Sequence, residues 1–109
     1  MLIDFAAVET KIMEHFKGGE KSFAVKMVTD ECNKIMFGRL IPGASIGYHV
    51  HEGESELFYF MEGCGRVQDD DQFVDITAGD CMATFSGHGH SVENTGDTNL
   101  VLLAVIIKD

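Results

Sequence analysis

Three histidines and one glutamate have the side chains and the spacing that a divalent metal ion requires. His49 and His51 stand two apart in the segment SIGYHVH, and the two-residue period of a β-strand directs both imidazoles to one face. Glu56 opens the next apolar segment, so a tight turn at residues 52–55 would return its carboxylate to the pair. His90 follows a glycine turn far along the chain and would complete the set. Three imidazoles and a carboxylate suit Fe, Mn, Co, Ni or Zn.

Each of these residues also has an ordinary structural interpretation. His-x-His pairs occur on plain surface strands, and a single histidine in a strand is usually exposed or hydrogen-bonded. Glu54 competes with Glu56 as the acidic ligand, and His88 is interpreted as a loop residue or a hydrogen-bond partner of a ligand. The combination favours the metal, because Glu56 shares a strand face with phenylalanines, where a buried carboxylate is costly unless a cation compensates its charge.

Short apolar segments between turns must position these side chains. They are rich in Val, Ile, Phe and Tyr, as strands are, and they cover residues 22–29, 34–41, 45–51, 56–62, 80–85 and 100–107. This pattern predicts an all-β sandwich or barrel. Only residues 4–17 have helical spacing, with Asp4 as the N-cap, a glycine pair at residues 18–19 as the stop, and an apolar stripe of Phe5, Val8, Ile12 and Phe16.

The two histidine-containing segments resemble the motifs of the cupin superfamily. Its first motif is matched in residue type and spacing by Gly43, His49, His51, Glu56 and Gly63, and its second by Gly79, Gly87, His90 and Asn94. One position differs, since Phe85 stands where the family usually has proline, which makes the turn before His90 less rigid.

The resemblance implies a double-stranded β-helix, a jelly-roll barrel of two antiparallel sheets. Residues 1–109 would form one small cupin domain, with an N-terminal helical or irregular arm at 1–20 and the barrel at 21–109. The motif positions imply that His49, His51, Glu56 and His90 bind a divalent metal ion near one mouth of the barrel.

Residues on the inward face of the same strands are expected to line a mostly apolar pocket beside the ion. Strand parity selects Ser45, Gly47, Phe58 and Phe60, with Met82, Thr84 and Phe85 from the second motif region. Arg39 is a candidate for holding a substrate carboxylate, with a surface position on a strand as the alternative. Such a pocket suits a compact, partly apolar or aromatic molecule that chelates the ion through oxygen atoms.

Two functions are compatible with such a site. The first is a divalent-metal-dependent enzyme, an oxygenase or an isomerase or lyase, acting on a small organic molecule; the alternative is a non-catalytic module that binds a sugar, an acid or another metabolite. The cupin superfamily includes both enzymes and non-catalytic binding proteins, so membership in it does not decide between these two functions. A ligand-sensing domain of a regulator is disfavoured, because no helix-turn-helix segment is evident.

Composition restricts the partners. The 109 residues are 45% hydrophobic and carry 8 Lys+Arg against 18 Asp+Glu, a formal net charge of -10, which disfavours nucleic acid and anionic membranes. No apolar run is long enough for a membrane helix and the N-terminus is acidic, so we expect a cytoplasmic protein. Cys32, Cys64 and Cys81 suggest neither a disulfide framework nor a thiolate zinc site.

The segments at 56–62 and 100–107 are apolar on both faces. A strand of this composition must be covered on both sides. We therefore expect a homodimer that buries the outer face of one sheet, with coverage by the N-terminal segment as the alternative.

Overall fold

The computed structural model describes residues 1–109, and nearly all of its regular structure is β-strand. The ten strands are β1 (Lys11–Glu14), β2 (Ser22–Thr29), β3 (Asn33–Leu40), β4 (Ser45–Val50), β5 (Glu54–Glu62), β6 (Cys64–Asp69), β7 (Gln72–Thr77), β8 (Cys81–Thr84), β9 (Gly89–Glu93) and β10 (Leu100–Lys108). Two short 3-10 turns, η1 (Phe5–Ala7) and η2 (Phe16–Gly18), flank β1. Neither is of a length or composition that would let it cross a membrane.

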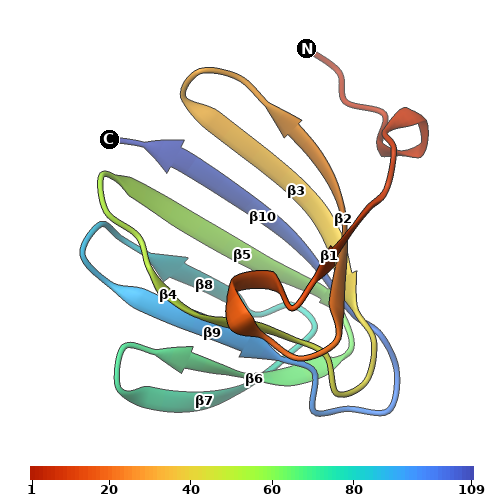
Figure 1. The fold of residues 1–109 in the computed structure, drawn as a ribbon, viewed down its shortest axis with the longest axis vertical. Coiled ribbons are helices and arrows are strands. Elements are labelled where there is room, and N and C mark those ends of the chain that lie inside the picture. The colour runs from red at the N-terminus through yellow and green to blue at the C-terminus, as the bar shows by residue number, and fades with distance from the viewer.

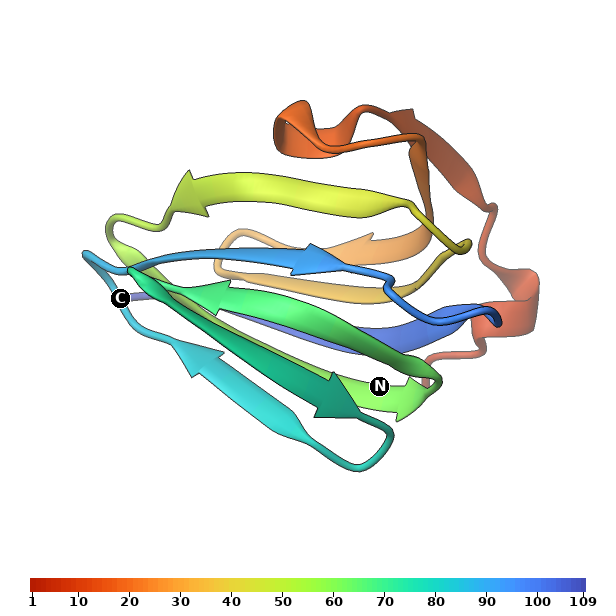
Figure 2. The same ribbon diagram turned by 90° about the horizontal axis from the view of Figure 1, so that it is seen from below.

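The strands form two antiparallel sheets that face each other (Figures 1 and 2). The larger sheet has the order β1-β2-β3-β10-β5-β8 and the smaller has the order β4-β9-β6-β7. Some neighbours are consecutive in sequence, such as β2 and β3, whereas others are distant, as β10 lies between β3 and β5. The prediction of an all-β jelly-roll fold is confirmed.

The core lies between the two sheets and follows the alternation of each strand. In β5, Glu56, Phe58 and Phe60 are buried, whereas Leu57 and Tyr59 are each 43% exposed on the outer face. The same alternation runs across the neighbouring strands, because Phe58 pairs with Ala104 of β10 and Met82 of β8, which are both buried. The strand period therefore turns the Glu56 carboxylate toward the interior.

The N-terminal segment is not the amphipathic helix predicted for residues 4–17. Asp4 does accept a hydrogen bond from the Ala6 amide, but the turn that it caps ends at Ala7. Residues 11–14 instead pair with residues 22–25 of β2, and His15 has a positive φ of 48°. The free edge of β2 offers backbone partners to residues 11–14, and this pairing outweighs the local helical pattern.

The η2 turn lies directly on β4, as Figure 2 shows. A Cβ atom on Gly19 would come within 2.0 Å of the Ser45 carbonyl oxygen, and a Cβ on Gly47 within 2.1 Å of the Lys17 carbonyl oxygen. The Ser45 hydroxyl accepts a hydrogen bond from the Glu20 amide at 2.8 Å. The arm thus approaches β4 to a distance that only glycine permits.

A methyl group at Gly19 should therefore separate the arm from β4. We expect Gly19→Ala to lower the free energy of unfolding by about 1–3 kcal/mol, because the opposing atoms belong to backbone and cannot turn aside. Denaturant unfolding measures the change, with the exposed neighbour Glu20→Ala as the control. Equal stability of the two variants would contradict this contact.

Candidate metal centre

The two sheets bring together the four residues that the motifs singled out. His49 lies in β4 and pairs directly with His90 of β9, while Glu56 comes from β5 of the facing sheet. His51 lies one residue past β4, where its amide donates to the His88 carbonyl oxygen at 3.1 Å. One nitrogen or oxygen atom from each of the four lies within 4.8 Å of the others. His51, Glu56 and His90 are buried, and His49 is partly exposed.

The distances between the donor atoms match the edges of an octahedron. The His90 Nε2 atom lies 3.1 Å from His51 Nε2 and 3.2 Å from His49 Nε2. The Glu56 Oε1 atom lies 2.9 Å from the Nε2 atoms of both His51 and His90. Two ligands at right angles on an ion with bonds of about 2.1 Å are about 3.0 Å apart, against about 3.4 Å for tetrahedral ligands. An octahedral ion held by four side chains keeps two positions for other molecules.

The outer ring nitrogens determine which tautomers are present. His49 Nδ1 lies 2.7 Å from the Gly47 carbonyl oxygen, and His51 Nδ1 lies 2.8 Å from Glu54 Oε1. Both oxygens accept, so both Nδ1 atoms donate, and in the neutral form of each ring the Nε2 lone pair turns inward. His90 Nδ1 contacts the Thr84 hydroxyl at 2.7 Å.

A single proton cannot satisfy this cluster. If His90 Nε2 carries a hydrogen, it can donate to only one of three neighbours, which are His49, His51 and Glu56. A divalent cation binds all three lone pairs and the carboxylate at once, and it compensates the buried charge of Glu56. The donor set present in the chain therefore fits a divalent metal ion.

Electrostatics keep His49 in its neutral form. Burial lowers the pKa of His49 below its usual value, and the neighbouring His90 and His51 lower it further. The Gly47 carbonyl and the Glu56 carboxylate raise the pKa of His49, but they do not overcome these effects. The imidazole thus offers its lone pair at neutral pH.

Three further residues orient the ligands. The carboxylate of Glu54, which the sequence left as a competing ligand, holds the His51 ring by its Nδ1 atom. Thr84 does the same for His90, and the Phe58 ring stacks on His90 with centroids 4.8 Å apart. Such partners fix the tautomer and the direction of a ligand.

His88 does not join the cluster. Its Nδ1 atom lies 2.6 Å from Asp70 Oδ2 at the surface, and the hydrogen bond with Asp70 raises the pKa of His88. Asp70 also accepts from the Gly89 amide at 3.0 Å. The contacts of Asp70 with His88 and Gly89 therefore hold the loop before His90 against the end of β6.

A cavity of about 380 Å³ opens beside the cluster, and His49, His51 and Glu56 form part of its wall. The apolar part of the wall consists of Met13, Phe16, Phe23, Met27, Met36, Ile46, Phe58 and Ile106. Glu54 and three lysines, Lys11, Lys17 and Lys34, complete the wall. The lysines were not among the residues predicted from the sequence. Lys34 is two residues from buried Met36 in β3, so strand alternation could have predicted that its side chain faces inward. Lys11 and Lys17 lie in the segment that was predicted as a helix, where this alternation was not expected.

The expected pocket residues have separate locations. Phe58 lines the cavity, Phe60 is buried in the core beyond it, and Met82 and Thr84 are buried on the inner face of β8. Apart from Phe58, the residues expected to line the pocket do not line this cavity, namely Ser45, Gly47, Phe60, Met82, Thr84 and Phe85. Ser45 is engaged by the arm, and Phe85 is 65% exposed in the loop after β8, so neither lines the cavity.

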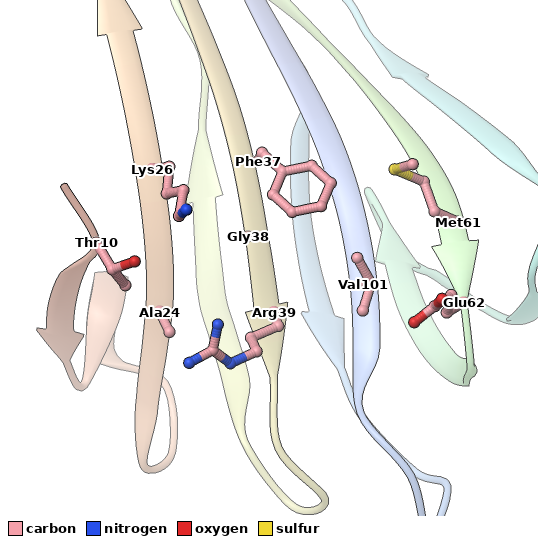
Figure 3. A pocket seen from close by; sticks show the side chains of 9 residues that line it. All are labelled: Thr10, Ala24, Lys26, Phe37, Gly38, Arg39, Met61, Glu62 and Val101. Carbon is pink, nitrogen blue, oxygen red and sulfur yellow. The ribbon is translucent and has the colours of Figure 1, made fainter. Parts of the chain in front are cut away.

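Arg39 also lies outside this cavity, on the opposite side of the larger sheet. In β3 the buried positions are Met36, Gly38 and Leu40, so the arginine between the last two faces outward. Figure 3 shows its guanidinium turned toward β2, where Ala24 and Lys26 lie, in a separate hollow of about 260 Å³ that Glu62 borders from β5. It therefore cannot hold a ligand of the metal cluster.

Comparisons with known proteins agree with this architecture. The family model described as "Cupin domain" matches residues 36–106. An oxalate-binding protein of Thermotoga maritima is 52% identical over 69 residues, which are 63% of this chain and 57% of that relative. The chain thus aligns with less than two thirds of that relative's length.

Solved structures match the whole chain. A crystal structure described as a predicted oxalate decarboxylase from Thermotoga maritima is 34% identical, with 100% of both chains covered and a TM-score of 0.94. The cupin domain of Cnp3 from Schizosaccharomyces pombe, at 12% identity, shares the fold with a TM-score of 0.82 over 100% of this chain and 74% of that one. The jelly-roll sheets, the histidine and glutamate cluster and the matched family model together show that this chain belongs to the cupin family.

Proposed function

We propose that the protein binds one divalent metal ion through His49, His51, Glu56 and His90 and uses it to hold a small organic acid. The observation that carries the proposal is the convergence of inward Nε2 lone pairs and a buried carboxylate that one proton cannot satisfy. Fe, Mn, Co, Ni and Zn all suit this donor set. The two remaining octahedral positions suit two oxygen atoms of one chelating ligand.

A carboxylate ligand is supported by two independent features. The cavity next to the cluster carries three lysines, which favour an anion. The relative named as an oxalate-binding protein and the structure described as a predicted oxalate decarboxylase both point to a small dicarboxylic acid.

We favour binding over turnover as the primary function. Both acidic groups of the cavity wall are engaged, Glu56 with the histidines and Glu54 with His51, so neither is free to act as a general acid or base. Turnover is the second candidate, an oxygenase or an isomerase or lyase reaction as expected from the sequence, or a decarboxylation as in the description of the Thermotoga structure.

Removal of one ligand should release the metal. We expect His51→Ala to lose most of the bound ion, because it removes an inward lone pair and leaves Glu56 with one imidazole fewer. Elemental analysis of protein purified without chelators or an affinity tag measures the content per chain. His15→Ala is the matched control, and unchanged metal content in His51→Ala would refute the assignment.

Ligand binding should depend on the ion. We expect isothermal titration of oxalate into manganese-loaded protein to show one site per chain, with no saturable binding to protein stripped with a chelator. Assay of carbon dioxide and formate in the same samples separates binding from decarboxylation. Equal affinity in loaded and stripped protein would contradict the proposed role of the metal.

We also propose that a second copy of the chain covers the outer face of the larger sheet. The N-terminal segment covers one side of this face, where the Phe5 and Phe37 rings stack with centroids 5.3 Å apart. Leu57, Tyr59 and Met61 of β5 remain 43% exposed.

Area and charge support a second copy as the occupant. Four strands of eight or nine residues and two of four present an outer face of roughly 650 Å², part of it under the N-terminal segment. This area approaches the ~800 Å² per partner of a standard interface. The hollow in Figure 3 carries both charge signs, with Lys26 and Arg39 on its β2–β3 side and Glu62 on its β5 side, so a two-fold axis could pair opposite charges.

Light scattering tests this assembly. We expect a particle of about twice the 12.0 kDa chain mass, and Tyr59→Glu should shift it to the monomer by placing a charge in the apolar contact. Phe73→Glu, at an exposed position of the smaller sheet, should leave the dimer intact. A monomeric wild-type protein would exclude the assembly.

A further inference from the structure

Three of the eight cationic residues of this acidic chain gather at one cavity. Lys11 comes from β1, Lys17 from η2 and Lys34 from β3, and all three line the cavity beside the metal cluster. None of them takes part in any ion pair of the structure. The cavity wall also carries the carboxylates of Glu54 and Glu56, but both contact histidines. The three lysines therefore favour a further anion in the cavity.

Strand register sets the position of Lys34 relative to the metal cluster. Ile106 of β10 pairs with Lys34 on one side and with Glu56 on the other. The three residues form one row across the sheet, and the cavity touches all of them. Two strand spacings separate the lysine and glutamate backbones by about 10 Å.

The wall between these two ends is apolar. Ile106, Met27, Met36 and Phe58 line it, and Glu54, the other acidic group at the cavity, is held by His51. A ligand that spans the cavity therefore meets a metal at one end, hydrocarbon in the middle and an ammonium group at the other end.

We infer that Lys34, assisted by Lys11 and Lys17, forms a second anion site, so that the cavity selects acids with two carboxylates joined by a short apolar chain. The inference rests on the proposed function, in which the metal binds the first carboxylate. Oxalate has adjacent carboxylates that a metal chelates together, so it does not reach Lys34. Succinate and glutarate have a spacer and reach both ends.

Titration of manganese-loaded protein with glutarate, butyrate and oxalate tests the inference. We expect the wild type to bind glutarate at least tenfold more tightly than butyrate, which has only one carboxylate. Lys34→Met keeps the length and apolar contacts of the side chain, and it should remove this preference while the manganese content stays unchanged. A double variant, Lys11→Met with Lys17→Met, should reduce the preference by a smaller factor.

Lys26→Met is the matched control, since it removes the same charge from the outer face of the same sheet and should leave the glutarate preference unchanged. If the wild type binds oxalate but does not prefer glutarate, or if Lys34→Met retains the preference, the second anion site is wrong and the proposed function stands. If no carboxylate binds the loaded wild type, both are wrong.

Discussion

The structure depends on one electrostatic feature: the inner nitrogens of three imidazoles and a buried carboxylate converge on one place, where a single divalent cation would satisfy them together. The outer nitrogens of His49 and His51 donate to acceptors, so in the neutral rings the inner nitrogens carry lone pairs. Burial keeps His49 neutral. The polar groups that line this end of the barrel are therefore complementary to a divalent ion and to little else.

The fold produces this convergence through strand register and alternation. Pairing of β4 with β9 places His49 against His90, and alternation along β5 turns Glu56 inward with Phe58. The N-terminal arm adds the remaining wall of the cavity, because glycines allow its backbone to lie on β4. The same arm contributes two of the three lysines that give the cavity its positive charge.

Much of this could be predicted from the sequence, because the signals are local. The two-residue period of His49 and His51 and the spacing of both cupin motifs identified the four clustered residues and the jelly-roll fold. The failures concern non-local interactions. Residues 11–14 have a helical pattern but pair with the edge of β2. An arginine at position 39 suits either face of a strand, so the sequence does not reveal that β3 directs Arg39 outward. The convergence of three lysines from separate segments is likewise visible only once the chain is folded.

Anomalous diffraction from crystals grown without added metal tests the shared cation most directly. The account predicts one anomalous peak within about 2.1 Å of three Nε2 atoms and one Glu56 oxygen, with octahedral angles and two positions left for other ligands. An anomalous peak at another place would contradict this account. So would a metal-free cluster in which the histidine rings turn away from one another.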